Sequence, residues 1–319
     1  MNKKYEFTGE TKTWVGRTLH RIRAKISFGF VVKGEIGGWI EAETNLAEDG
    51  DAWVYCDARV YGDARVYGNA QVSGDARVSG DARVSGDAWV SGDAWVSGDA
   101  RVYGDARVYG DARVSGNAQV SGNAQVSGDA RVYGDARVSG DAWVSGDARV
   151  YGDARVYGDA RVSGNAQVSG NAQVSGDARV YGDAWVYGDA QVSGDARVYG
   201  DARVYGDAWV SGDAWVSGNA WVSGNAWVSG DARVYGDAHF ITIGPIGSEN
   251  GVFTAYRTEA GIQCNRGCFH GTLDEFEAAV QKTHGDSQYA KEYRLVIELV
   301  RQRLKAEEQE FAAAEASDL

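Results

Sequence analysis

The chain contains few of the residues on which disulfide-linked, membrane and proline-rich proteins depend. Its 319 residues include one proline, one methionine, three cysteines and four histidines. Three cysteines in a chain of this length do not make a disulfide framework. No apolar run reaches the roughly 18 residues that a membrane helix requires, and the polar start Met1–Phe7 does not resemble a signal peptide. We therefore expect a cytoplasmic protein with no membrane association.

Positive charge is also scarce. Lysine and arginine number 32 against 45 acidic residues, so the formal net charge is −13. A nucleic-acid-binding surface needs a basic patch, and nucleic acid is therefore not an expected partner. From Asp51 to Ala238 lysine is absent, and every arginine follows an aspartate two positions earlier. We interpret these pairs as charge-balancing ladders on one side of a strand; cation binding by the aspartates and mimicry of DNA are the alternatives.

The stretch from Asp51 to Ala238 repeats one six-residue phrase. Valine occupies every sixth position from Val54 to Val234, 31 times in all, and alanine stands two positions before each valine. Alternating apolar and polar residues indicate a strand with one buried face, and the Gly-Asp or Gly-Asn that follows indicates a bend. Short strands and bends at a strict period predict a β-solenoid, whose turns bury their apolar face by stacking. A core of valine and alanine leaves no internal ligand cavity.

The phrase resembles the hexapeptide repeat of left-handed parallel β-helices. In that repeat an aliphatic residue is followed four positions later by a small one, as Val66 is followed by Ala70. Three hexapeptides form one triangular coil in that family. The resemblance implies about ten coils and, at ~4.8 Å per strand layer, a length on the order of 50 Å.

The segments on either side of the repeats carry two further patterns. These consist of Leu19, Arg21, Ile22, Ala24, Phe28, Val32, Gly34, Gly37–Trp39, Asn45 and Leu46 before the repeats, and Gly267–Phe269, Gly271, Thr272, Glu275, Phe276, Thr283–Gly285 and Tyr289–Tyr293 after them. These patterns resemble those of hexapeptide-repeat proteins from bacteriophages, prophages and enteric bacteria. The resemblance implies a phage-type protein, and some such proteins are labelled acetyltransferases.

Residues 1–50 are expected to form an amino-terminal β cap. Tyr5–Phe7 and the alternating run from Ile22 to Phe28 indicate strands. Gly37–Ile40 echoes the repeat phrase, and Leu46 follows six residues after Ile40. We therefore expect an irregular first coil and a cap that protects the open strand edge.

Residues 239–319 are expected to form a small α+β domain with two helices and a polar tail. A strand ends at Pro245, and the Asn250-Gly251 pair predicts a hairpin turn. The predicted elements are strands Val252–Arg257 and Ile262–Cys264, a helix opened by the capping box Thr272–Glu275 and closed by Gly285, a second helix with an apolar stripe from Tyr289 to Leu304, and the tail Glu307–Leu319.

A long duplication inside the repeats bears on surface function. Residues 90–136 recur identically as residues 138–184, a shift of eight hexapeptides. Because eight is not a multiple of three, a three-hexapeptide coil places the copy on a different face. Asn117–Gln125 and its copy Asn165–Gln173 would then lie on different faces, so a flat binding array on one face is not expected.

Candidate binding residues lie near the carboxy-terminal end of the repeats and after it. Four tryptophans occupy successive outward positions, and the first and last would share a face. Dense exposed tryptophan can mark an interaction patch; the alternative is that outward aromatics simply cover the strands. The candidate binding residues are Trp209, Trp215, Trp221, Trp227, Arg257, Cys268, His284 and Tyr289.

A metal site is a lesser candidate. Cys264, Cys268, His270 and His284 are close in sequence, and thiolates and imidazoles bind zinc. Their spacing is not that of a standard zinc knuckle, however, and packing is the favoured interpretation. No catalytic residue and no cofactor are expected.

Three functions remain in contention. An acyl-CoA-dependent acetyltransferase would need a catalytic base, usually histidine, on a loop that interrupts the coils, and the repeats contain neither. A non-enzymatic scaffold could present its carboxy-terminal domain to a host or phage macromolecule, including in an inhibitory or anti-defence role. A structural protein could associate with itself, for example as a lateral trimer. The second function is the favoured hypothesis, with a protein as the expected partner, and self-association is its alternative.

Overall fold

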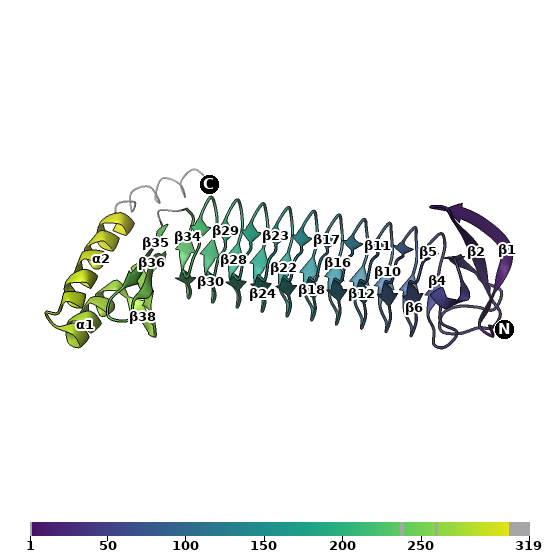
Figure 1. Ribbon diagram of the computed structural model, residues 1–319, viewed down its shortest axis with the longest axis horizontal. Helices are drawn as coiled ribbons and strands as arrows, with labels where there is room; N and C mark the ends of the chain where they lie inside the picture. Colours follow the sequence, from purple (N-terminus) through teal and green to yellow (C-terminus); the bar gives the residue numbers. More distant parts are fainter. Residues whose placement is uncertain (1, 237–238, 259–260, 306–319) are drawn as a thin grey trace. The chain divides into compact units, whose positions relative to one another are not determined.

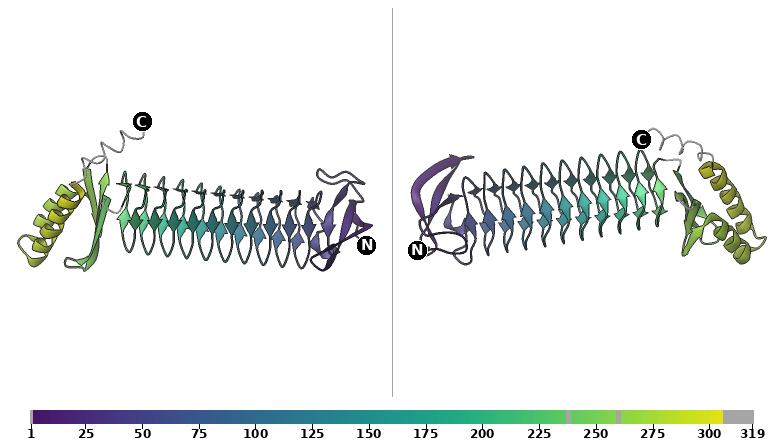
Figure 2. Two further views of the ribbon diagram at one scale, coloured as in Figure 1. Left: turned by 90° about the horizontal axis from the view of Figure 1, so that it is seen from above. Right: turned by 180° about the vertical axis from the view of Figure 1, so that it is seen from behind.

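The computed structural model describes residues 2–236, 239–258 and 261–305. It contains two compact units, Met1–Gly182 and Asp183–Leu319, and repeated coils are present in both (Figures 1 and 2). The boundary between the units falls within the repeats. The predicted segments 1–50, 51–238 and 239–319 therefore stay a prediction.

The repeats form a parallel β-solenoid of about eleven turns. Each valine and the residue before it make a two-residue strand, from β4 (Trp53–Val54) to β25 (Arg179–Val180) in the first unit and from β26 (Trp185–Val186) to β34 (Arg233–Val234) in the second. Within each sheet of the repeats a strand pairs with the strand three earlier or three later in the chain, as Val66 pairs with Val84. Successive strands belong to three different sheets. One turn therefore consists of three hexapeptides, one on each face, as the resemblance implied.

Buried side chains and backbone hydrogen bonds together hold the turns of the repeats against one another. The valines and alanines of the repeats are at most 1% exposed. Backbone bonds link each turn to the next: Arg131 donates to the carbonyl of Ala148 across 2.9 Å, and Tyr133 donates to that of Val150 across 3.0 Å. Gly134, at φ 73°, makes the bend between strands, a conformation that costs glycine little.

The amino-terminal segment forms an antiparallel hairpin and an irregular first turn. Strands β1 (Tyr5–Trp14) and β2 (Arg17–Ala24) pair with each other, and β2 also pairs with β3 (Ile36–Ile40). Strand β3 then pairs in parallel with β5 (Arg59–Val60), and a 3-10 helix, η1 (Glu43–Asn45), leads to the bridge between Leu46 and Val66. The expected irregular first coil is confirmed.

The predicted strand from Ile22 to Phe28 is too long. Strand β2 ends at Ala24, and Ile26 is exposed. Phe28 instead pairs with Val31 in a short turn and places its ring 5.4 Å from that of Trp53. The alternating pattern could not show that this phenylalanine turns back onto the first coil.

The duplicated segment occupies different faces, as predicted. Strand β15 (Gln119–Val120) belongs to the ten-stranded sheet, whereas its copy β23 (Gln167–Val168) belongs to the thirteen-stranded sheet. Both lie in the first unit. The outward pattern of the repeats is therefore not conserved along any one face.

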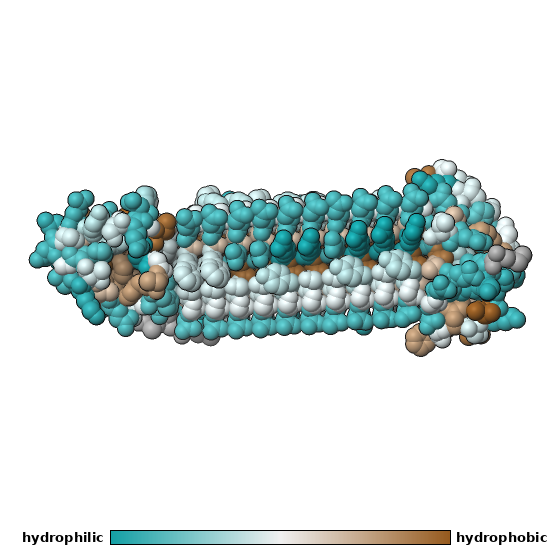
Figure 3. Space-filling model, turned by 60° about the horizontal axis from the view of Figure 1, so that its bottom comes forward, coloured by the Kyte–Doolittle hydropathy of each residue, from teal (hydrophilic) through white to brown (hydrophobic). Residues whose placement is uncertain are grey.

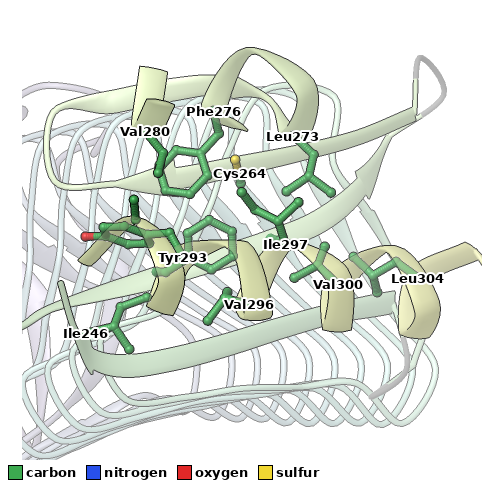
Figure 4. Packing of buried hydrophobic residues seen from close by; sticks show 13 residues of the cluster. Ile246, Cys264, Leu273, Phe276, Val280, Tyr293, Val296, Ile297, Val300 and Leu304 are labelled. Carbon is green, nitrogen blue, oxygen red and sulfur yellow. The ribbon is translucent and has the colours of Figure 1, made fainter. Parts of the chain in front are cut away.

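The carboxy-terminal segment, within the second unit, is a four-stranded antiparallel sheet with two helices. Its elements are β35 (Phe240–Ile246), β36 (Gly251–Thr258), β37 (Gly261–Arg266), β38 (Phe269–Thr272), α1 (Leu273–His284) and α2 (Gln288–Lys305). Figure 4 shows Phe276 from α1 and Tyr293 and Ile297 from α2 among the side chains that pack together. The capping box is confirmed, because Glu275 donates its backbone N–H to the Thr272 hydroxyl across 3.2 Å.

Two features of this segment differ from expectation or fall outside it. The fourth strand, β38, was not predicted, because its four residues include a glycine and only one large apolar side chain. The predicted tail Glu307–Leu319 and the end of the repeats at Asp237 and Ala238 lie outside the described residues. No helix in the described part of the chain is long and apolar enough to cross a membrane.

Candidate functional site

The outward residues of the coils are bonded to one another from turn to turn. Trp89 donates its indole N–H to Ser73 across 3.1 Å, and Trp143 donates to Ser127 across 3.2 Å. In each pair the serine follows a valine, and the tryptophan precedes the valine of the next turn. The indole polar group is thus satisfied on the surface. Along the coils on the face shown in Figure 3, hydrophilic residues form rows, and a narrow band of apolar residues lies between them.

Tyrosine and glutamine use the same relationship. Tyr109 donates its hydroxyl to Gln125 across 3.2 Å, and Tyr157 donates to Gln173 across the same distance. Sequence reasoning missed these pairs, although their regular spacing is visible once a turn of three hexapeptides is assumed. The outward positions are therefore matched in pairs and not independent.

The corners of the coils carry rows of aspartate interrupted by asparagine. Asn117 donates its amide to Asp135 of the next turn across 2.9 Å, and Asn123 donates to Asp141 across 2.8 Å. A donor between stacked carboxylates relieves part of their mutual repulsion. Arg59 lies 3.5 Å from Asp75 of the next turn, so this arginine balances charge between turns. The predicted balancing within one strand, between aspartate and arginine two residues apart, stays a prediction.

The four candidate tryptophans lie on three faces. Trp209 on β30 (Trp209–Val210) and Trp227 on β33 (Trp227–Val228) stack, with ring centroids 5.3 Å apart and planes 7° apart. Their predicted common face is confirmed. Trp215 on β31 (Trp215–Val216) and Trp221 on β32 (Trp221–Val222) belong to the other two sheets. They do not form one patch.

Arginines cover the two unstacked tryptophans. The guanidinium groups of Arg197 and Arg233 each lie 4.8 Å from the ring centroid of Trp215, and that of Arg203 lies 5.0 Å from Trp221. Such cation–π contacts occupy ring faces that a ligand would otherwise use. Of the four rings, Trp209 and Trp227 are the pair that bears no such arginine in the described residues.

The candidate residues of the carboxy-terminal segment are not gathered into one site. His284 and Tyr289 come together where α1 meets α2, with ring centroids 6.0 Å apart. Arg257 is half-buried on β36 and pairs with Ile262, at the start of β37. Cys268 is exposed in the turn after the end of β37, so it lies at the opposite end of that strand.

The metal candidates are likewise dispersed. Cys264 is buried in the core and points its thiol at the carbonyl of Thr272. Burial raises the pKa of Cys264 to about 12, so the thiol stays protonated. His270 bonds Asn265, and His284 packs against Tyr293 at 5.7 Å. Within the described ranges no three histidine, cysteine or acidic side chains form a metal-binding group.

The amino-terminal cap covers the first turn of the solenoid in the first unit. Trp53 is fully buried, with Tyr5 and Phe28 against its ring at 6.2 and 5.4 Å. The Tyr5 hydroxyl donates to the carbonyls of Glu43 and Leu46, each at 3.1 Å, and burial raises its pKa.

Lys4 belongs to the same cap, and its burial disfavours the charged form of the side chain. Its ammonium donates to the carbonyl of Ala47 across 3.2 Å and lies 4.6 Å from the Phe28 ring centroid. Desolvation by burial lowers the pKa of Lys4 to about 8, although Asp51 and Asp49 act in the opposite direction.

The carboxy-terminal sheet covers the last turn of the solenoid in the second unit. Asn265 donates its amide to the carbonyl of Trp227 across 2.8 Å, and the Trp227 N–H reaches the Thr254 hydroxyl at 3.4 Å. Tyr256 and Ser229 share a hydrogen bond of 3.0 Å. Strand edges that would otherwise pair with another chain are thus bonded in each unit by a non-repetitive cap.

A comparison with protein families gives one match that covers the coils. The family described as "Bactofilin: Polymer-forming cytoskeletal" matches residues 57–253, more than half of the chain. The match spans the repeats from Asp57 onward, strand β35 and the first three residues of β36. No curated protein matches the chain.

Proposed function

Because the chain belongs to the bactofilin family of polymer-forming cytoskeletal proteins, we propose that it is a structural protein that assembles with copies of itself. The match over residues 57–253 carries this proposal, since it covers almost the whole solenoid. Self-association was the alternative in the sequence analysis, and the comparison supports it better than the favoured hypothesis.

The caps limit the surfaces through which copies of the chain could assemble. Bare solenoid ends could pair strand to strand, but β2 bonds the edge strand β3 in the first unit, and β36 and β37 contact the last turn in the second. Copies would therefore meet through the outward rows on the flanks of the coils or through the caps. The flanks offer paired aromatic and polar residues, such as Trp89 with Ser73.

The experiment is to measure the mass of the full chain across a concentration series by sedimentation velocity and light scattering, with electron microscopy of the same samples. Assembly predicts species heavier than the 34.2 kDa monomer, whose share rises with concentration. A single 34.2 kDa species at every concentration would overturn the proposal.

The favoured hypothesis of the sequence analysis stays a prediction. It describes a non-enzymatic scaffold of phage type that presents its carboxy-terminal domain to a macromolecular partner. The family description names a structural role and no reaction, which agrees with a non-enzymatic protein. The phage origin, the hexapeptide-repeat label and a lateral trimer are supported by the resemblance of the residues alone.

A further inference from the structure

Some aromatic rings of the coils stack in pairs between neighbouring turns. Tyr133 and Tyr151 stack with centroids 5.0 Å apart, and Tyr187 and Tyr205 with centroids 4.9 Å apart. Trp209 and Trp227, which precede their valines instead of following them, stack in the same way at 5.3 Å. These distances are typical of aromatic stacking, and each pair ends where the equivalent residue of the next turn is not aromatic.

Trp227 is the later ring of its pair. Its strand, β33, is the terminal strand of the ten-stranded sheet. Trp209 covers one face of its indole. The position three hexapeptides after Trp227 is Pro245, which belongs to β35 of the antiparallel sheet, so no equivalent ring of a following turn stacks on the other face. Trp227 is 36% exposed.

A cavity of about 340 Å³ adjoins this tryptophan. Trp227 and Asn225 line it from the last turn, while Gly251, Val252 and Arg266 line it from strands β36 and β37. The volume lies at the lower end of the range for small-molecule sites, roughly 300–1,000 Å³. All of these residues belong to the second unit.

Arg266 supplies a polar group to the cavity. Its side chain is 9% exposed, and one terminal nitrogen donates to the carbonyl of Ile246 across 3.0 Å. The other terminal nitrogen lies 3.9 Å from Glu249, but Nε is buried with no hydrogen-bond partner among the described residues. A buried donor without a partner is costly. Because Nε has almost no accessible surface, an acceptor in the cavity would satisfy it once the guanidinium group turns toward the cavity.

The position of Arg266 beside the cavity requires a glycine at residue 251. A Cβ at that position would collide with the guanidinium group of Arg266. The absence of a side chain at residue 251 therefore lets the arginine lie close against β36 and beside the cavity.

We propose that this cavity binds a small planar aromatic molecule that carries a carbonyl oxygen. The ring stacks on the face of Trp227 opposite Trp209. The oxygen accepts the Nε–H of Arg266. All residues of this site come from one copy of the chain, so its occupation does not depend on the proposed self-association.

The test uses the full chain labelled with 5-fluorotryptophan and the neutral probe indole-3-acetamide. The fluorine resonance of Trp227 is identified as the one missing from Trp227→Leu. Of the 11 tryptophans, Trp227 should show the largest saturable shift on titration. Cyclohexylacetamide, which has no aromatic ring, and indole, which has no carbonyl, should each bind at least tenfold more weakly. Equal binding of either control, or no saturable shift of Trp227, would overturn the proposal.

Variants then locate the site by calorimetry. Trp227→Leu should lower the affinity for indole-3-acetamide at least tenfold, and Val252→Phe should do the same by filling the cavity while Trp227 is kept. The matched control is Trp143→Leu, because Trp143 is also an outward tryptophan of the coils, 39% exposed, but bonds Ser127 far from the cavity in sequence. Unchanged binding in Val252→Phe, or an equal loss in the control, would place the probe elsewhere and refute the site.

Discussion

A Cβ on Gly134 would lie 3.0 Å from the backbone nitrogen of Gly152, the equivalent glycine one turn later. Gly134 also has φ 73°, which a residue with a side chain adopts at a cost of about 1–2 kcal/mol. The equivalent glycines of successive turns form a row along the coils. Glycine is needed at these positions for two reasons: the bend has a positive φ, and the backbones of successive turns lie close together there.

Substituting Gly134 by alanine should consequently destabilise the coils by more than the backbone conformation alone. We expect a loss of about 2–4 kcal/mol, from the left-handed conformation together with overpacking against the next turn. Urea unfolding followed by circular dichroism, with hydrogen exchange of the amides near residue 134, would measure it.

The matched control is Gly224→Ala. Gly224 has the same place in the repeat and φ 61°, but nothing lies within 4 Å of a Cβ there. It should lose only the conformational part, about 1–2 kcal/mol. Equal losses in the two variants would show that contact between the glycine rows does not constrain the spacing of the turns.

The solenoid could be predicted because every six-residue phrase contains the same three features: two apolar residues, an outward residue between them and a glycine at the bend. The burial of Trp53 could not be predicted from these features. Its phrase is like that of Trp89, yet Trp53 is fully buried and Trp89 is 46% exposed. The difference arises from Tyr5 and Phe28, which approach from outside the repeats.

The candidate sites were predicted less well, for a related reason. Nearness in sequence suggested that Cys264 and Cys268 could act together, but a strand end and a turn separate them, and only Cys268 is exposed. The cavity beside Trp227 depends on how β36 and β37 meet the last turn. No periodicity encodes that contact.

Cysteine reactivity should follow burial. Cys56 and Cys268 are exposed, whereas Cys264 is buried and its pKa is raised to about 12. Because the thiolate is the reactive form, iodoacetamide at pH 8 should modify Cys56 and Cys268 and leave Cys264 unmodified, as read by peptide mass spectrometry. Urea-unfolded protein, in which all three should react, is the control. Rapid modification of Cys264 in the folded protein would contradict its placement in the core.

Lys4 should make the amino-terminal cap more stable as pH rises. Its pKa is about 8 in the fold and 10.5 in an unperturbed lysine, so between these values the unfolded chain binds more protons. The free energy of unfolding therefore increases with pH over this interval. The gain should be at most ~1.4 kcal/mol per unit of pKa difference.

Comparison with Lys4→Met isolates this effect. The raised pKa values of Tyr5 and Cys264 act in the opposite direction, because their neutral forms are favoured by the fold and lost above the unfolded pKa. Both residues are present in both proteins, so their contributions cancel in the difference. Thermal unfolding of the two proteins is measured between about pH 8 and 10. The stability of the wild type should rise relative to that of the variant over this interval. An equal dependence of stability on pH in both proteins would refute a buried Lys4 with a lowered pKa.

Removing the amino-terminal hairpin should change how copies assemble. A chain without residues 1–35 would leave β3 as an unpaired edge and uncover Trp53, and open strand edges recruit other chains. We expect larger or longer assemblies by electron microscopy and sedimentation. The control is Phe30→Ser with Val32→Ser, which replaces side chains that are 88% and 65% exposed and keeps the hairpin. An unchanged size distribution in the truncated chain would show that the hairpin does not protect an edge.

Salt should strengthen association through the flanks. Copies of a chain with a formal net charge of −13 repel one another, and the screening length falls from about 30 Å at 0.01 M salt to about 8 Å at 0.15 M. The outward rows that would meet are held by neutral pairs such as Tyr109 with Gln125, whose contacts salt affects little. The assembled fraction at one protein concentration should therefore rise with sodium chloride in sedimentation experiments. Sucrose at matched viscosity controls for the medium. A fall with salt would instead indicate that arginines of one copy pair with the aspartate rows of another, and that charge, not the aromatic and polar rows, joins the flanks.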